Sequence, residues 1–280
     1  MKSFPIGVML ESFRLPVLEA LENAKRLGVQ GIQVYATNGE LSPEKLDQSK
    51  RKAFLAQVKD KGLVISAVCG DLGHGFGNAG RNPELIERSR HILDLSLEWE
   101  CGIVTTHIGV VPNDPAHPRY EVMQAACGAL ARCADSMGAR FAVETGPETA
   151  VTLKAFLDSL HSRGVSVNLD PANLVMVTGD DPVAAVHTLK DYIVHTHAKD
   201  GKRLYFRDPE KVYGIVYEEL LTSPSFMEVP LGKGSVDFAA YLDALRQINY
   251  RGFLTIEREV GEDPAGDIQK AVEYLKALFE

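Results

Sequence analysis

The chain has few cysteines, and their spacing excludes two common uses of this residue. Only four occur among 280 residues, and no two of them form a Cys-x-x-Cys pair. A closed structural zinc site or a dithiol redox centre usually contains such pairs. Cys69, Cys101, Cys127 and Cys133 lie instead within ordinary strand or helix patterns, as reduced cysteines of a cytosolic protein do. We therefore expect no disulfide.

Long apolar runs are also missing. No run reaches the roughly 18 residues that a membrane-spanning helix requires. Residues 1–5 lead directly into a predicted strand and lack a secretory apolar stretch with a cleavage site. The sequence therefore predicts a soluble, cytoplasmic protein that has no membrane partner.

Positive charge is in deficit. The chain has 30 Lys and Arg residues against 38 Asp and Glu residues, which gives a formal net charge of -8. This balance disfavours binding to the phosphate backbone of nucleic acid. A small-molecule ligand is the better expectation.

The chain does contain a regular alternation of short β-type runs and amphipathic segments. The predicted strands are residues 6–9, 31–35, 63–69, 103–108, 141–144, 165–170, 193–197 and 253–257. The predicted helices are residues 16–27, 44–61, 83–99, 120–137, 153–163, 182–189, 238–248 and 267–279. Strict alternation implies parallel strands, and eight such units in 280 residues favour an α/β fold of the (β/α)8 TIM barrel type. We expect residues 1–280 to form one domain.

A doubly wound Rossmann sheet is the alternative fold. It would carry a Gly-x-Gly-x-x-Gly motif after its first strand, where this chain has residues 7–12, GVMLES. One irregularity interrupts the alternation, at residues 200–236. A long segment after a barrel strand is usually functional, so we expect a covering loop with a short helix around residues 209–221.

Four of the predicted strands end on residues that bind metals. Glu144, Asp170 and Glu257 have the opposite parity to the apolar Val143, Leu169 and Ile256, so these carboxylates face inward, and His197 ends the remaining segment. The C-terminal ends of barrel strands converge at one mouth, where residues distant in sequence can meet. Three buried carboxylates need a cation to neutralise them. Oxygen ligands with one imidazole suit Mn²⁺, Mg²⁺ or Co²⁺ better than a thiolate-rich zinc site.

Each of these residues also has a structural explanation. Asp170 precedes Pro-Ala-Asn and would suit the start of a helix as its N-cap. His195 has the same parity as His197 and should lie one layer deeper, as a hydrogen-bonded core residue. His107 has inward parity near the end of the fourth strand, where a substrate contact and a structural role are both open.

Five segments resemble the xylose isomerase-like barrel superfamily, and within it the sugar or sugar phosphate isomerase/epimerase group that includes ketose 3-epimerases. They are VET at 143–145, DPAN at 170–173, HTHAKD at 195–200, LGKGSVDF at 231–238 and TIERE at 255–259. The likeness extends over nearly the whole chain, although before Glu144 it consists only of the strand–helix rhythm.

The resemblance implies one divalent ion held by Glu144, Asp170, His197 and Glu257, with Mn²⁺ expected and Mg²⁺, Co²⁺ or Zn²⁺ as alternatives. It also implies that Arg203, six residues after the metal histidine, contacts sugar hydroxyls. A homodimer or homotetramer is a further expectation from the resemblance alone.

Two positions depart from the ketose 3-epimerase pattern. Asn173 stands where those enzymes have a histidine three residues after the metal aspartate. Ala150 stands where they have a second glutamate, and Glu148 is near that position but out of register. These differences leave the fold and the metal site as expected but weaken a specific epimerase assignment.

The expected reaction is proton transfer at a carbon beside a carbonyl, through an enediolate. Glu144 and Glu257 would remove and return the proton from opposite sides of a carbohydrate substrate. Arg203, Glu148, Asn173 and His107 would orient its hydroxyl groups. Tyr205 and Phe206, on the long loop, would cover the site and exclude water.

Three other functions compete with this one. A lyase or dehydratase acting on an oxidised sugar, glycoside or related polyol would use the same site and expel a β-substituent from the enediolate. A DNA-repair endonuclease of the superfamily would need more histidines than the eight present and would have to overcome the acidic balance. A non-catalytic sugar-binding barrel would not need paired glutamates. Lys233, between Gly232 and Gly234, would either anchor a substrate phosphate or lie in a simple turn.

Overall fold

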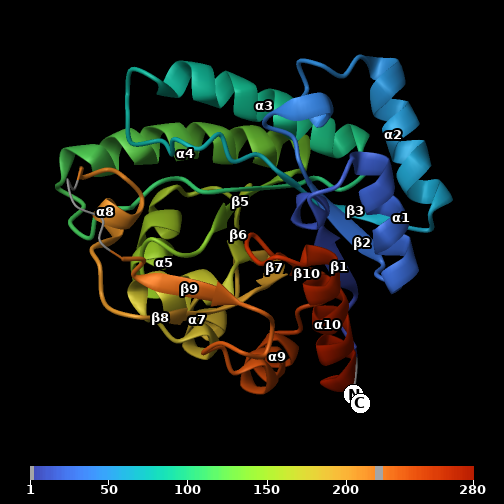
Figure 1. Cartoon of the computed structure of the whole chain (residues 1–280). Helices are drawn as coiled ribbons and strands as arrows, with labels where there is room; N and C mark the ends of the chain where they lie inside the picture. Colours follow the sequence, from blue (N-terminus) through green and yellow to red (C-terminus); the bar gives the residue numbers. More distant parts are fainter. Residues whose placement is uncertain (1–2, 218–222) are drawn as a thin grey trace.

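Eight parallel strands close into a barrel, which confirms the (β/α)8 prediction (Figure 1). The structure is a computed structural model and describes residues 3–217 and 223–280. The barrel strands are β1 (Ile6–Met9), β2 (Gly31–Tyr35), β3 (Val64–Cys69), β4 (Ile103–Thr106), β5 (Arg140–Glu144), β6 (Val165–Leu169), β7 (Ile193–Ala198) and β10 (Leu254–Ile256). β1 completes the ring by pairing with both β10 and β2, with Gly7 opposite Thr255 and Gly31.

Helices surround the barrel, as strict alternation requires (Figure 1). They are α1 (Val17–Leu27), α2 (Gln48–Asp60), α3 (Asn82–Glu98), α4 (Pro118–Met137), α5 (Ala150–Ser159), α7 (Pro182–Thr188), α9 (Phe238–Gln247) and α10 (Pro264–Ala277). Short 3₁₀ turns occupy Leu10–Phe13 and Gly39–Leu41. In the described part of the chain, no helix has the length and apolar character needed to cross a bilayer.

Helix boundaries differ from the predicted ones where a capping side chain decides them. α2 begins at Gln48 and not at residue 44, because the Asp47 side chain accepts a hydrogen bond from the Lys50 amide. α5 begins at Ala150, ahead of the predicted residue 153, because Thr149 caps it in the same way through the Thr152 amide. Apolar periodicity does not register such caps, so it placed these helix starts incorrectly.

The interior of the barrel is polar at the level just below the metal-ligand candidates. Gln33 Nε2 donates to Thr105 Oγ1 at 2.9 Å. His195 contacts Asn168 Oδ1 and Thr255 Oγ1, each at 2.8 Å. All five side chains are buried, and this satisfied network agrees with the predicted core role of His195. The apolar core lies instead between the strands and the surrounding helices, at residues such as Val8, Val143 and Leu169.

The irregular segment after β7 forms a small second sheet. β8 (Asp200–Arg203) pairs antiparallel with β9 (Phe226–Val229), and α8 (Pro209–Val212) lies between them in sequence. The predicted helix around 209–221 is therefore shorter within the described residues, and positions 218–222 lie outside them. After β6, one helical turn, α6 (Pro171–Asn173), continues into a π-helical turn at Leu174–Thr178.

The Asp200 side chain holds the start of the segment after β7 against its end through hydrogen bonds to backbone amides. Its Oδ1 accepts hydrogen bonds from the amides of Gly201 at 2.9 Å and Val236 at 3.2 Å. Its Oδ2 accepts from the amides of Gly232 at 3.0 Å and Gly234 at 2.8 Å. The Gly-Lys-Gly turn therefore wraps around a buried carboxylate, and the Lys233 side chain is exposed.

Candidate metal centre

Glu144, Asp170, His197 and Glu257 converge at the mouth of the barrel. Glu144 ends β5, Asp170 follows β6, His197 lies in β7 and Glu257 follows β10. All four are buried, and each contributes one ligand atom to a group whose members lie within 4.8 Å of one another. The sequence predicted this convergence from strand parity alone; metal binding itself stays a prediction.

Asp170 serves both of the roles considered for it. Its Oδ1 accepts a hydrogen bond of 2.9 Å from the Asn173 amide and so caps α6. Its Oδ2 faces His197 Nδ1 at 3.3 Å. The cap and the cluster use different oxygens of the same carboxylate, so one does not exclude the other.

His197 presents one ring nitrogen to all three carboxylates. Nδ1 lies 3.5 Å from Glu144 Oε1, 3.3 Å from Asp170 Oδ2 and 3.3 Å from Glu257 Oε2. On the other side of the ring, Nε2 lies 3.0 Å from Gln33 Oε1. That oxygen needs a donor, because the amide's Nε2 already points to Thr105. Asn168 Nδ2 also lies 3.2 Å from His197 Nε2 but donates to Glu144. With Gln33 as the acceptor, the proton of the neutral ring lies on Nε2 and the Nδ1 lone pair faces the cluster, as in a metal-binding histidine.

The charges at this centre favour a cation. Burial lowers the pKa of His197, but Glu257 and Glu144 raise it by more, so it lies well above its usual range. The imidazole is thus held in its protonated form and, together with Lys199, provides the positive charge that faces these carboxylates. A divalent ion would supply the same positive charge and displace that proton. Three hard oxygen donors and one nitrogen fit Mn²⁺, Mg²⁺ or Co²⁺.

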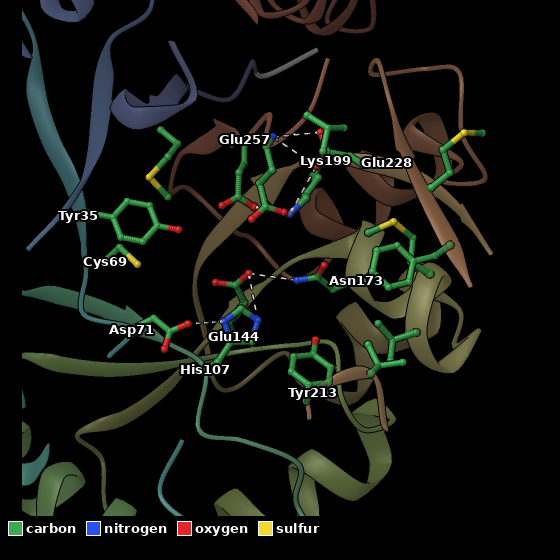
Figure 2. Close-up of a pocket in the computed structure, with 18 residues that line it drawn as sticks. Tyr35, Cys69, Asp71, His107, Glu144, Asn173, Lys199, Tyr213, Glu228 and Glu257 are labelled. Carbon is green, nitrogen blue, oxygen red and sulfur yellow. Dashed lines mark hydrogen bonds and ion pairs between the residues drawn. The ribbon is translucent and has the colours of Figure 1, made fainter. Parts of the chain in front are cut away.

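A cavity of about 510 Å³ opens over the cluster. Figure 2 shows Glu257 and Glu144 extending into it from different sides, with Lys199 and Glu228 beside Glu257 and His107 beside Glu144. Asp170 and His197 do not line the cavity and are fully buried behind it. A ligand in the cavity can therefore contact the carboxylates of Glu144 and Glu257, whereas Asp170 and His197 lie out of its reach.

Two of the predicted substrate-contact residues line this cavity next to Glu144. Asn173 Nδ2 donates to Glu144 Oε1 at 3.2 Å. His107 Nε2 lies 3.7 Å from the same oxygen, and its Nδ1 lies 3.2 Å from Asp71 Oδ2. Burial lowers the pKa of His107, but Glu144 and Asp71 raise it to about 9. Both residues are thus placed to donate hydrogen bonds to an oxygen in the cavity.

The other two predicted contacts do not line it. Arg203 is exposed, and its guanidinium donates to the Thr178 carbonyl at 2.9 Å. Glu148 is buried beside a neighbouring cavity, where its Oε2 accepts a long hydrogen bond of 3.4 Å from the Val111 amide. Burial raises the pKa of Glu148 to about 8.

The predicted cover is also made by a different residue. Tyr205 and Phe206 are exposed and do not line the cavity over the cluster. Tyr213, which follows α8, does line it, with its ring centroid 6.0 Å from that of His107. Tyr205 and Phe206 were chosen because they lie on the long loop. The turn at α8 instead directs Tyr213 toward the cavity.

Lys199 is the main residue that the sequence analysis missed. Its Nζ donates to Glu257 Oε2 at 2.9 Å and to Glu259, and it lies 4.0 Å from Glu228 Oε2. Only 4% of its side chain is exposed. Its position two residues after His197 gives it the same inward parity, and that signal would have found it.

Comparisons with known proteins agree with this architecture. A family model described as "Xylose isomerase-like TIM barrel" matches residues 21–278. A putative L-ribulose-5-phosphate 3-epimerase of Escherichia coli is 25% identical to the chain over 282 residues, which cover 94% of this chain and 91% of that protein. The crystal structure of a xylose isomerase domain protein from Planctomyces limnophilus aligns with a TM-score of 0.79 and 25% identity, covering 99% of this chain and 96% of that one.

The fold is also shared with an enzyme of another class. A probable 3-DHS dehydratase from Bacillus anthracis aligns with a TM-score of 0.76 and 18% identity, over 98% of this chain and 99% of that one. The fold alone therefore does not choose between epimerase and dehydratase. The match to the family model over residues 21–278 confirms the resemblance inferred from the sequence, and the chain belongs to the xylose isomerase-like TIM barrel family.

Proposed function

We propose that this protein is a sugar isomerase or epimerase that depends on a divalent metal ion, with Mn²⁺ as the expected ion. The observation that carries the proposal is the pair of cluster carboxylates, Glu144 and Glu257, that line one cavity from different sides. Two bases at a single carbon are what reversible proton transfer with inversion requires. The epimerase name of the relative at 25% identity supports the same reaction class.

A cation held by Glu144, Asp170, His197 and Glu257 would supply the positive charge that acidifies a proton beside a carbonyl. Of Glu144 and Glu257, the one that is ionised would remove that proton, and the other, carrying a proton, would return it to the opposite face. Return to the neighbouring carbon instead would give an isomer. Asn173 and Asn168 each donate to a different oxygen of Glu144, at 3.2 and 3.1 Å, and so fix the orientation of the carboxylate.

Lys199 keeps the second carboxylate, that of Glu257, in its ionised form. Burial raises the pKa of Glu257, but Lys199 and His197 lower it well below its usual range, so the carboxylate stays ionised. His107, supported by Asp71, would donate to a substrate oxygen. Tyr213 would exclude water from the same side of the cavity.

Solvent deuterium incorporation tests this proposal. The Mn²⁺-loaded protein should label ketoses at the carbon beside the carbonyl, and chelation should stop the labelling. Glu144→Gln and Glu257→Gln should each abolish it. Glu262→Gln is the matched control, because Glu262 is exposed and lies outside both the cavity wall and the cluster. Full labelling by the Glu144→Gln, Glu257→Gln double variant would contradict the mechanism.

The lyase is the second candidate, and one contact favours it. Burial lowers the pKa of Lys199, but Glu257, Asp170, Glu259 and Glu228 raise it well above its usual range, so a protonated amine lines the cavity. Such a group would donate a hydrogen bond to the leaving-group oxygen during β-elimination and stabilise the negative charge that develops on it. An unsaturated product or a released aglycone, without an epimer, would select the lyase over the epimerase.

A further inference from the structure

The cavity over the cluster is lined by an excess of acidic side chains. Five carboxylate residues contribute to its wall: Asp71, Glu144, Glu228, Glu257 and Glu259. Among the described lining residues, Lys199 and His107 are the only ones that can carry a positive charge. Neither is uncommitted, because Lys199 contacts three of these carboxylates and His107 pairs with Asp71.

A bound divalent ion does not reverse this balance. The cluster contributes three carboxylates, so an ion of charge +2 leaves one net negative charge at the centre. Lys199 offsets that charge, and Glu259 then remains as a further negative group on the cavity wall. A phosphate carries close to two negative charges at neutral pH and would be repelled from such a site.

Three groups near the cavity that could bind a phosphate already have acidic partners. The amides of the Gly232–Gly234 turn, a potential phosphate loop, donate to Asp200. Arg119 lines an adjoining cavity and forms an ion pair with Glu210. Arg258 is buried between Glu228 at 2.5 Å and Asp267 at 2.9 Å. Residues 218–222, which the structure does not describe, include no lysine or arginine in the sequence.

One side of the cavity is mainly apolar. It is formed by Met176 and Val177 of the π-helical turn, Val212 and Tyr213 at α8, and Phe226 and Met227 of β9. Met176, Val177 and Ala172 also form a small buried apolar cluster against Tyr213 and Phe226. A phosphate placed against this side would lose water and gain only the Tyr213 hydroxyl as a hydrogen-bond donor. The carbon-bound hydrogens of a sugar, or an apolar substituent on it, would lose little.

We propose that the substrate is an uncharged keto sugar, without a phosphate or carboxylate group. This inference rests on the proposed function and adds to it the charge class of the substrate. It separates the protein from its relative in Escherichia coli, whose name specifies a phosphorylated pentulose. A free ketose and a keto-glycoside share the required chemistry, and the apolar wall provides space for the aglycone of the second.

Binding of unreactive polyols tests the inference without relying on turnover. Ribitol and ribitol 5-phosphate have no carbonyl group, so calorimetric titration of each into the Mn²⁺-loaded full-length protein measures affinity alone. We expect ribitol to bind at least about tenfold more tightly, because like charges at a site are strongly unfavourable. Equal affinity, tighter binding of the phosphate, or binding of neither compound would overturn the inference.

Deuterium labelling of ribulose and ribulose 5-phosphate, under the same conditions, tests proton transfer and the charge of the substrate separately. Preferential labelling of ribulose supports proton transfer and an uncharged substrate. Tighter ribitol binding with no labelled or epimerised ketose would refute proton transfer while leaving the charge class intact. A phenyl keto-glycoside included in the panel distinguishes the two uncharged sources, since the apolar wall should favour it if the aglycone is recognised.

A charge introduced on the apolar wall provides the reverse test. Met227 is 46% exposed at the cavity rim. Met227→Lys should shift the ratio of the affinities for ribitol 5-phosphate and ribitol about two- to fivefold toward the phosphate, the effect of one exposed ion pair. Met227→Gln is the matched control of similar length. An affinity ratio that does not respond to the lysine would contradict the claim that the charge of the cavity wall excludes a phosphate.

Discussion

Lys199 Nζ lies 2.9 Å from Glu257 Oε2, the same oxygen that faces His197 Nδ1 at 3.3 Å. One carboxylate oxygen therefore lies between a buried ammonium and a buried imidazole. This arrangement makes Lys199 part of the electrostatic balance of the cluster, although its amine is not a potential metal ligand while it stays protonated.

Removal of the Lys199 amine should destabilise the protein strongly. Lys199→Met leaves Glu257 and Glu228 buried without that partner, and breaking a buried ion pair in this way costs about 3–5 kcal/mol. Denaturant unfolding measures the loss. Lys154→Met is the matched control, because Lys154 forms an exposed pair with Asp158 and its removal should cost less than about 1 kcal/mol. Similar losses in the two variants would contradict the assigned role of Lys199.

Metal binding should be visible as thermal stabilisation. A ligand that binds only the folded state at 100 times its Kd adds about 2.7 kcal/mol to the free energy of unfolding. We expect Mn²⁺ to raise the Tm and a chelator to reverse the rise. The Glu144→Gln, Glu257→Gln double variant should lose most of this response. An undiminished response in that variant would place the ion elsewhere.

Gln33 should control metal affinity without contacting the ion. Gln33→Met removes the acceptor that fixes the ring proton of His197 on Nε2, and loss of such an orienting contact typically lowers metal affinity 10–100-fold. Competition with a fluorescent chelator measures the change. Gln57→Met, on the exposed face of α2, should have no effect. Unchanged affinity after Gln33→Met would show that the ring is oriented by other groups.

Glu148 should make stability depend on pH in a direction unusual for a carboxylate. Burial raises its pKa from 4.5 to about 8 in the folded state. Below pH 4.5 the Glu148 carboxyl group is protonated in the folded and unfolded states, so it does not change the free energy of unfolding with pH. As pH rises from about 4.5 to 8, the unfolded state releases the proton and the folded state retains it, so folding becomes less favourable by up to about 1.4 kcal/mol per pH unit.

The variant Glu148→Gln tests this assignment. As the pH rises from 5 to 8, the free energy of unfolding of the variant should increase relative to that of the unmodified chain. Above pH 8 the difference between the two free energies should stay constant. Urea unfolding at several pH values provides the comparison. A constant difference between pH 5 and 8 would mean that Glu148 is already ionised when folded.

The sequence was sufficient to predict the barrel and its cluster because both follow from periodicity. Strand parity placed Glu144, Asp170, His197 and Glu257 on the inner face, and the closed ring of parallel strands brought them together. The same rule applied two residues beyond His197 would have included Lys199. These residues lie in or next to β-strands, where two-residue repeats fix the direction of each side chain.

Residues outside the barrel strands were less predictable. Arg203 lies in β8, which pairs antiparallel with β9 outside the barrel, so its direction is set by a second sheet. Glu148 follows a turn at Gly146, where φ is 153° and a side chain would collide with Asn173 and Tyr213. Such local geometry depends on contacts between distant loops, and no periodic pattern in the sequence records it.

Asp200 also defines which part of the protein is free to vary. By holding the amides of residues 201, 232, 234 and 236 around one carboxylate, it ties the two ends of the segment above the barrel at a point next to Lys199. Residues 204–225, which exclude Glu228 and its contact with Lys199, can therefore change in length or sequence while β8, β9 and the cluster keep their geometry. An exchange of these residues between members of the family would alter the cavity wall above an unchanged cluster, and they are the place to begin engineering.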